Sequence, residues 1–544
     1  MTGVPSSRSA ACLAALLSVV ATPLLQGDQQ DRPVFRSNTR LIEVSVIVTN
    51  RDRESVPDLT AADFQVFDDG RPQKVELFSI EAGTTSAPAQ PSAPPTRAKR
   101  EFSNDVPQSG GVTIVLLDQL NTSDSDRMYA REHIARFLEQ IRPDDRVGLY
   151  VLDGNGALRV VHDFTSDASA LVRAVSKLRG NTSQALAGEQ DAARLAAEEN
   201  AARVEGELGN LLGGGANESG AREMQAHYQG NRAEDTIDAF ESIGHHLSGI
   251  QRRKNLIWIS SGFPLQAFTY RGRSATTGIS RATRSLNDAN VALYAVDARG
   301  LIAAFASQGR VSVPTLSMVQ TSQDILQSVS EQTGGRAFVN TNDIQGAIRR
   351  AIDDGRMTYV LGYYPADDRW NGRFHRIVVK VNRPGLNVRH REGYYAVATQ
   401  EQAGSQRRDA LNAAVQSPID ASALGMTLRV DPVAGTPSDY RLTVRIQPGA
   451  IGLERHADEV RGAVDVVVAQ VRADAAEGRG LDRRLAISVA GDRLPQFLRE
   501  GLTVDHTFTL VPSAERLRVI VRDVRTGAVG AIGVSRQQLQ AIVR

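Results

Sequence analysis

Asp118 and Thr122 follow a run of apolar and β-branched residues that extends from Val112 to Leu117. A strand without a polar face is one that is buried on both sides, as in a parallel sheet covered by helices. In sheets of this kind, ligands bind beyond the carboxyl ends of the strands. The carboxylate of Asp118 and the hydroxyl of Thr122 therefore stand where a ligand would bind. This turn is the first candidate for a functional site.

Other residues whose side chains could bind a ligand or react lack the neighbouring residues that a known kind of site requires. His245 and His246 have no acidic ligand motif beside them. The sequence contains no His-Glu-x-x-His, Gly-x-Ser-x-Gly or Gly-x-x-x-x-Gly-Lys-Ser/Thr pattern. It therefore lacks the residues that these metalloproteases, hydrolases and nucleotide-binding proteins require. The glycines at 213–215 follow no predicted strand, which favours a flexible loop over a phosphate-binding loop. His375 and His390 are predicted to be surface residues on β-strands.

The elements that must position the turn alternate between strands and helices from Gly111 onward. Ser123 or Asp124 can cap a helix whose apolar residues recur every three or four positions. Strands are predicted at 112–117, 146–152, 157–161, 255–260, 291–297 and 335–339, and helices near 123–142, 167–178, 233–250, 280–289, 322–333 and 344–352. This alternation predicts a Rossmann-like α/β domain with a mostly parallel, doubly wound sheet.

The regions on both sides of this domain are predicted to be all-β. Asp69-Gly70 between two alternating runs indicates a hairpin, and the C-terminal region shows short strands at regular spacing. The predicted boundaries are a signal peptide at 1–27, an N-terminal β-sandwich unit at 34–81, a linker at 82–109, the α/β domain at 110–355 with an exposed insertion at 181–230, a β extension at 356–397 and a C-terminal β-sandwich at 421–544. The β extension is expected to pair with the N-terminal β unit, because strands on both chain sides of an inserted domain often do.

Composition indicates a folded protein with several domains. The chain has 544 residues, 41% hydrophobic and 23% charged, which predicts about three domains. Lys and Arg number 63 against 62 Asp and Glu, for a formal charge of +1. This balance gives no overall electrostatic reason to expect nucleic acid or an anionic membrane as a partner.

The N-terminus has the pattern of a secretory signal peptide. Arg8 precedes an uncharged stretch at 10–21, and a polar stretch begins at Gly27. The protein is therefore expected to be exported, to the periplasm or beyond. Its one cysteine, Cys12, lies inside this segment, so the mature chain is expected to have no disulfide bonds. No later stretch has the length of apolar sequence that a transmembrane helix needs.

Several motifs together resemble a known family. Segment 111–355 resembles a von Willebrand factor A domain, and the arrangement of the whole chain resembles the acidobacterial VWFA-related proteins. The matching pieces lie at 59–64, 68–70, 116–118, 121–122, 359–365, 372–377 and 391–395. The resemblance extends from about Phe35 to Ala396 and is less specific beyond that point.

The resemblance implies a degenerate metal-ion-dependent adhesion site. The family pattern is Asp-x-Ser-x-Ser after the first strand, a Thr in a second loop and an Asp after the fourth strand, and such oxygen ligands suit Mg²⁺ or Mn²⁺. Asp118 and Thr122 match the first Asp and second hydroxyl, and Thr182 matches the second-loop Thr. Leu120 replaces the middle Ser, although Asn121 stands nearby, and Ser261 replaces the final Asp.

Losing a carboxylate and a hydroxyl is expected to weaken cation binding, because less charge offsets the dehydration of the ion. An alternative without metal is also open for these residues. In that alternative Asp118 caps the following helix and Thr122 accepts hydrogen bonds from backbone N–H groups.

The resemblance implies noncatalytic protein binding or adhesion. The expected contact surface is the upper rim of the A-domain, formed by Asp118, Asn121, Thr122, Thr182 and Ser261, with the 181–230 insertion. One alternative is an accessory or assembly factor of the cell envelope whose A-domain works without metal. A remote alternative is a hydrolase. The sequence does not specify the partner or the oligomeric state.

Overall fold

The computed structural model describes residues 41–82, 100–104, 111–178, 215–250, 252–263, 275–300, 313–365, 370–397, 404–436, 438–456, 458–472 and 478–543. The predicted signal peptide, most of the predicted linker and residues 181–214 of the predicted insertion lie outside this part of the chain. Among the residues just given, no helix is long and apolar enough to cross a membrane.

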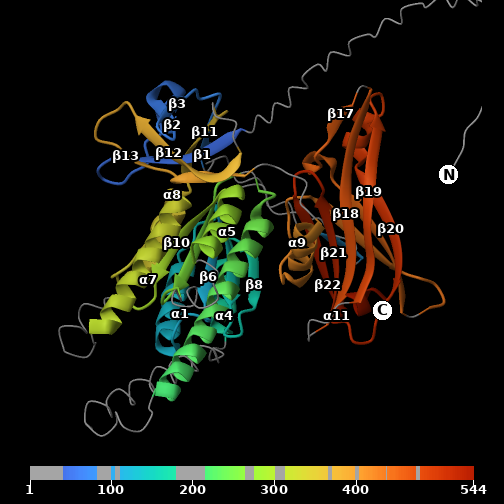
Figure 1. The fold of residues 1–544 in the computed structure, drawn as a ribbon, viewed down its shortest axis with the longest axis horizontal. Helices are drawn as coiled ribbons and strands as arrows, with labels where there is room; N and C mark the ends of the chain where they lie inside the picture. Colours follow the sequence, from blue (N-terminus) through green and yellow to red (C-terminus); the bar gives the residue numbers. More distant parts are fainter. Residues whose placement is uncertain are drawn as a thin grey trace, which may run out of the picture. The chain divides into compact units, whose positions relative to one another are not determined.

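A central sheet with strand order β10-β9-β6-β7-β8 forms the α/β part of the protein (Figure 1). Its strands are β6 (Gly111–Asp118), β7 (Asp145–Leu152), β8 (Leu158–Thr165), β9 (Lys254–Ser260) and β10 (Val291–Asp297). Neighbouring strands are parallel, apart from β8, which lies antiparallel to β7. The predicted mostly parallel sheet is confirmed.

Helices bury both faces of this sheet. They are α1 (Asp124–Leu138), α2 (Ala168–Ser176), α4 (Gly215–Leu247), α5 (Ala275–Asp288), α7 (Val313–Gln332) and α8 (Ile344–Asp354). Successive residues of β6 enter different cores: Leu116 packs in the core that contains Phe240 of α4, and Leu117 packs in the core that contains Phe137 of α1. Burial on both sides is the reason that β6 shows no alternation of polar and apolar residues.

Two local predictions were wrong. Helix α4 begins at Gly215, so residues 215–230 of the predicted insertion belong to the same helix as the stretch predicted from Ala233. The Ala, Glu, Gly and Asn composition of that stretch carries no apolar stripe, which is the signal that sequence periodicity detects. The predicted edge strand at 335–339 is reduced to one isolated bridge between Val296 and Phe338.

An N-terminal β unit is assembled from both chain sides of the α/β part. Its strands are β1 (Ile42–Thr49), β2 (Phe64–Asp68), β3 (Arg71–Gln73), β4 (Leu77–Ala82), β11 (Met357–Tyr363), β12 (Asn371–Val381), β13 (Asn387–Arg389) and β14 (Gly393–Val397). They form two sheets, β13-β1-β11-β4 and β14-β12-β2-β3, which share one apolar core. β1 pairs with β11 and β2 with β12, so the expected pairing between 34–81 and 356–397 is present.

The C-terminal region also contains two sheets around a shared core. Its elements are α9 (Gly404–Gln416), β15 (Met426–Pro432), β16 (Asp439–Ile446), β17 (Glu454–His456), β18 (Glu459–Val471), β19 (Gly478–Ala490), α10 (Leu494–Glu500), β20 (Leu502–Thr509), β21 (Arg516–Asp523), β22 (Val529–Ser535) and α11 (Arg536–Val543). One sheet has the order β20-β16-β15-β5, and the other has the order β17-β18-β21-β22 with β19 beside β18.

The strand β5 (Glu101–Ser103) joins this C-terminal sheet although it precedes the α/β part in the sequence. Asn104 holds the end of β5 in place. Its Nδ2 donates to the carbonyl oxygens of Ala421 (2.6 Å) and Leu424 (2.8 Å), and its Oδ1 accepts from the N–H of Met426 at 2.8 Å. The stretch predicted as a linker therefore contains a structural part of the C-terminal region.

Asn104→Ala is expected to lower the free energy of unfolding by about 2–4 kcal/mol, because it leaves buried backbone groups without their hydrogen-bond partners. Urea unfolding of the full chain measures this loss. Arg100→Ala is a suitable control, since it removes only an exposed ion pair with Asp431 and should cost less than about 1 kcal/mol. Equal losses in both variants would contradict a specific role for Asn104.

Candidate functional site

The carboxyl edge of the central sheet brings the ends of β6 and β9 together. Leu117 lies opposite Ile259 in the register of these parallel strands, so Asp118 and Ser260 are neighbours at the next position. Trp258 stands two residues before Ser260 and its side chain therefore points to the same face of the sheet. The three side chains of Asp118, Trp258 and Ser260 meet at this edge.

Asp118 is fully buried, with 0% of its surface exposed, and both oxygens of its carboxylate accept hydrogen bonds. Oδ1 accepts from the backbone N–H of Asn121 at 2.9 Å. Oδ2 accepts from Asn121 Nδ2 at 2.8 Å, from Trp258 Nε1 at 3.0 Å and from Ser260 Oγ at 2.9 Å. The carboxylate is thus enclosed by donors from the protein itself.

The surroundings of Asp118 also include a buried positive charge. Burial raises the pKa of the Asp118 carboxyl above its usual value, while the hydrogen bonds from Asn121, Ser260 and Trp258 oppose this shift. Arg127 of α1 is buried too; burial lowers its pKa, and the negative charge of Asp118 opposes that change. A fixed guanidinium therefore lies within electrostatic reach of the carboxylate.

The hydroxyl groups of Thr122 and Ser261 form hydrogen bonds within the protein. Thr122 is buried, and its Oγ1 accepts from the backbone N–H of Ser261 at 3.2 Å. The Oγ of Ser261 donates to Asp126 Oδ2 at 3.0 Å. Ser123 begins α1 as its N-cap, accepting from the N–H of Asp126 at 3.3 Å. These contacts connect the ends of β6 and β9 to the first turn of α1.

Asn121 extends the same network to α4. Its Nδ2 donates to Thr236 Oγ1 at 2.9 Å, in addition to its contact with Asp118. Its Oδ1 is buried and has no hydrogen-bond partner in the described part of the chain. Thr182, the predicted second-loop hydroxyl, lies outside the described residues.

The donor set around Asp118 does not fit Mg²⁺ or Mn²⁺. These ions need oxygen ligands that are available for coordination and usually keep several waters. Asp118 and Thr122 are buried, and their oxygens already accept hydrogen bonds from the protein. A cation would have to displace these donors. Thr122 accepts a backbone N–H, as the alternative without metal expected, but Asp118 does not cap α1: Ser123 is the N-cap, and Asp118 accepts from Asn121, Trp258 and Ser260.

Two parts of the sequence-based site need correction. Three of the predicted contact residues are buried: Asp118, Asn121 and Thr122. They hold the turn after β6 in place and are not accessible to a partner. Ser260 and Trp258, which the sequence did not single out, contact Asp118 directly, whereas Ser261 is hydrogen-bonded to Thr122 and Asp126. Trp258 and Ser260 share a face because side chains two positions apart on a strand do so, but only the pairing of β9 with β6 places that face at Asp118.

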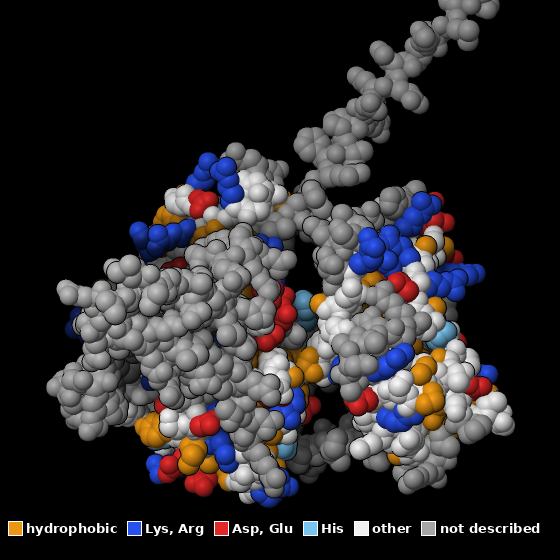
Figure 2. Space-filling view, turned by 60° about the horizontal axis from the view of Figure 1, so that its bottom comes forward, with side chains coloured by type: hydrophobic (Ala, Val, Ile, Leu, Met, Phe, Trp, Pro, Cys, Tyr) orange, Lys and Arg blue, Asp and Glu red, His pale blue; other side chains and the backbone are white. Residues whose placement is uncertain are grey.

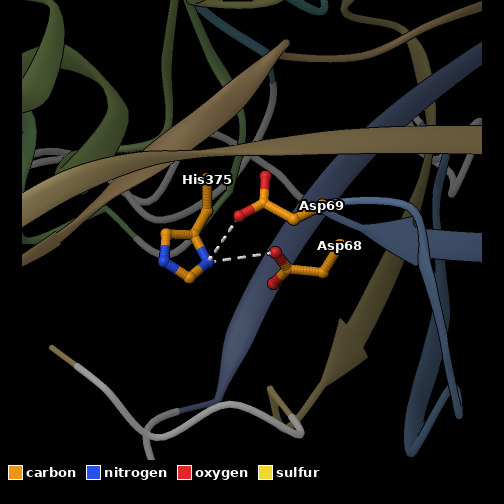
Figure 3. A group of neighbouring side chains, drawn as sticks. All are labelled: Asp68, Asp69 and His375. Carbon is orange, nitrogen blue, oxygen red and sulfur yellow. Dashed lines mark hydrogen bonds and ion pairs between the residues drawn. The ribbon is translucent and has the colours of Figure 1, made fainter.

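A second polar cluster lies in the N-terminal β unit and was not predicted. Asp68 and Asp69 stand at the β2–β3 hairpin, and His375 stands on the neighbouring strand β12 (Figure 3). His375 is only 7% exposed, so its prediction as a surface residue was wrong. Tyr363 and Tyr394 both donate to Asp68 Oδ2 at 2.9 Å. Asp68 and His375 are 307 residues apart, which hid their contact from sequence patterns.

No protein-family model and no curated protein matches the sequence. The similar solved structures include von Willebrand factor type A proteins. One of these, from Catenulispora acidiphila, is 11% identical with a TM-score of 0.24, over 85% of this chain and 73% of that one. The ArnB paralog VWA2 from Sulfolobus acidocaldarius is 8% identical with a TM-score of 0.21, over 86% and 74% of the two chains.

An aerotolerance-related membrane protein from Bacteroides fragilis, with multiple mutations to serines, is also similar. It is 15% identical with a TM-score of 0.24, over 45% of this chain and 99% of that one. TM-scores of this size carry no argument by themselves. The α/β assignment therefore rests on the strand order, the strand directions and the two helical layers of the chain itself.

Proposed function

We propose that this chain is an exported, noncatalytic protein-binding or adhesion protein of the von Willebrand factor A type, which binds its partner at the carboxyl edge of the central sheet. The observation that carries the proposal is the enclosed hydrogen-bond network of Asp118. It fixes the turn between β6 and α1 from below, and loops held by a rigid scaffold are common binding surfaces. Export is supported by the signal-peptide pattern at 1–27.

The proposed contact surface is the exposed start of α1, at Asp124, Ser125 and Met128. Met128 is 72% exposed, the largest exposed fraction among the large apolar side chains of the described residues. Methionine adapts its shape to different apolar partners, and it is common on binding surfaces. Asp124 forms an ion pair with the buried Arg127, which anchors the exposed carboxylate beside Met128. A partner with an apolar side chain and a basic group would complement this surface.

The charge distribution supports a protein partner over nucleic acid. On the face drawn in Figure 2, Lys and Arg side chains are interspersed with Asp and Glu side chains over the described residues. Nucleic-acid binding depends on a continuous basic surface that neutralises phosphates. The formal charge of +1 agrees with the mixed surface.

A second candidate is an accessory or assembly factor of the cell envelope whose A-domain works without metal. The same enclosed carboxylate favours it, because Asp118 takes its hydrogen bonds from Asn121, Trp258 and Ser260 instead of holding an ion. The two candidates differ in the kind of partner: an adhesion protein binds a separate partner, whereas an assembly factor holds a fixed partner within one complex.

Site-specific photo-crosslinking in the full chain tests both candidates. A photoreactive amino acid at Met128 is expected to capture a distinct protein partner, and Asp124→Ala should reduce that crosslink. The same photoreactive residue at Leu498, an exposed position on α10, is the matched control. Crosslinks at Leu498 equal to those at Met128 would refute the proposed surface. A Met128 crosslink within a complex that copurifies with the chain favours the assembly factor, and a crosslink that forms only with separately added protein favours adhesion.

A further inference from the structure

Three potential metal ligands converge at one edge of the N-terminal β unit. Within the described residues, one oxygen of Asp68, one oxygen of Asp69 and one ring nitrogen of His375 all lie within 4.8 Å of one another. Figure 3 shows both carboxylates pointing toward the same nitrogen of the imidazole ring. The cluster is remote in sequence from the Asp118 turn and plays no part in the function proposed above.

In each carboxylate one oxygen is anchored by the protein and the other faces His375. Asp68 Oδ2 accepts from the hydroxyls of Tyr363 and Tyr394, while Asp68 Oδ1 lies 3.1 Å from His375 Nδ1. Asp69 Oδ1 accepts from the N–H of Arg376 at 2.8 Å, while Asp69 Oδ2 lies 3.6 Å from His375 Nδ1. One oxygen of each carboxylate and one ring nitrogen therefore lie close together, while the other oxygen of each carboxylate is held by the protein.

The separations match those between the ligands of a tetrahedral metal ion. With metal–ligand bonds of about 2.0–2.2 Å, two ligands of a tetrahedral Zn²⁺ lie roughly 3.3–3.6 Å apart. The nitrogen–oxygen distances of 3.1 and 3.6 Å bracket that range. The two carboxylate oxygens lie within 4.8 Å of each other, so the exposed Asp69 side chain is the one that would move to complete the site.

We propose that Asp68, Asp69 and His375 bind a divalent transition-metal ion, with Zn²⁺ as the preferred ion. Imidazole nitrogen suits Zn²⁺ better than Mg²⁺ or Ca²⁺, and Zn²⁺ binds mixed nitrogen and oxygen sites more tightly than Mn²⁺ or Fe²⁺. Zn²⁺ would bind the neutral imidazole through Nδ1, and the ring proton would then be carried by Nε2. Asp69 is partly exposed, which leaves the fourth position for water.

The two tyrosines supply the outer contacts that a metal-binding carboxylate needs. Burial, followed by the negative charge of Asp68, raises the pKa of both tyrosine hydroxyls, so they stay protonated as donors. Hydrogen bonds of this kind orient a ligand and leave its other oxygen for the metal. Tyr363 comes from β11, in the opposite sheet, so its hydrogen bond to Asp68 joins the two sheets beside the cluster.

Isothermal titration of untagged full-length protein with Zn²⁺ tests the proposal. Wild type is expected to bind one equivalent in a saturable step. Asp69→Asn should weaken binding at least about 100-fold, because even outer-sphere partners change metal affinity about 10–100-fold. Asp69 has a φ of +47°, a left-handed conformation that Asn tolerates, so the variant should fold. Tyr394→Phe should weaken binding about 10–100-fold through loss of orientation.

Asp52→Asn is the matched control, because it removes an equal charge from an exposed turn of the same β unit. Its Zn²⁺ affinity should equal that of wild type. The proposal is overturned if wild type shows no saturable binding, or if Asp69→Asn binds as tightly as wild type. The second result would place the ion elsewhere, and would leave Asp68 and His375 as a hydrogen-bonded pair without metal. Neither result bears on partner binding at Met128.

Discussion

Asp118→Ala is expected to lower the free energy of unfolding by about 3–5 kcal/mol, although the residue belongs to no apolar core. The substitution removes the acceptor for Trp258 Nε1, Ser260 Oγ and both donors of Asn121. These donors are buried, so water cannot replace the lost carboxylate without a rearrangement of the turn. Urea unfolding at neutral pH measures the loss.

Asp118→Asn is the matched variant, because it keeps the shape of the side chain and one acceptor oxygen. Its loss should be smaller, about 1–3 kcal/mol. Both losses should be the same in excess Mg²⁺ and in EDTA, since the donors come from the protein. If Mg²⁺ stabilises wild type but not Asp118→Asn, a cation binds at Asp118, and the hydrogen-bonded network alone is the wrong explanation for its burial.

Wild-type stability is expected to rise by about 2 kcal/mol between pH 7 and pH 9, relative to Lys254→Met. Lys254, the first residue of β9, is 1% exposed, and its Nζ donates to the Ile250 carbonyl at 2.6 Å. Burial lowers the pKa of Lys254 to about 7, and the charge of Glu81 only partly opposes this effect. Over a range of pH, the Lys254 side chain is therefore a neutral amine in the folded protein and a charged ammonium in the unfolded chain.

The sign follows from proton binding. Between about pH 7 and pH 10.4 the unfolded chain binds the Lys254 proton more strongly than the folded protein does, so stability increases with pH. Relative to Lys254→Met, the stability of wild type is highest above the pKa of Lys254 in the unfolded chain, and it falls as the pH is lowered toward 7. Lys254→Met removes this dependence and should be at least as stable as wild type at pH 7, because a methionine carries no charge to desolvate.

Chemical unfolding of both proteins at pH 7 and pH 9 checks this expectation. Lys74→Met is the matched control, because Lys74 is exposed and its replacement should leave the pH dependence unchanged. Parallel stability curves for wild type and Lys254→Met would show that Lys254 keeps an ordinary pKa. The burial of its ammonium would then have to be offset by a contact other than that with Glu81.

The candidate site could be predicted in part. The apolar run before Asp118 indicated a strand buried on both faces, and β6 confirms it. The prediction located the turn beyond that strand, yet it selected Ser261 where the structure has Ser260. The predicted strand 255–260 already ended at Ser260, and what the sequence did not contain was its register against β6. A shift of one residue moves a side chain to the opposite face of a sheet, so register decides which serine meets the carboxylate.

The sequence by itself determined those strands and helices whose pattern of apolar, polar and capping residues is complete within a few positions of the chain. Runs such as 112–117 and 291–297, and the capping residue Ser123, act through local contacts that periodicity records. Only the tertiary structure decided that β5 joins the C-terminal sheet, that His375 is buried against Asp68, and that Asp118 is enclosed by Trp258. These partners lie more than a hundred residues apart, and their contacts exist only once the sheets have assembled.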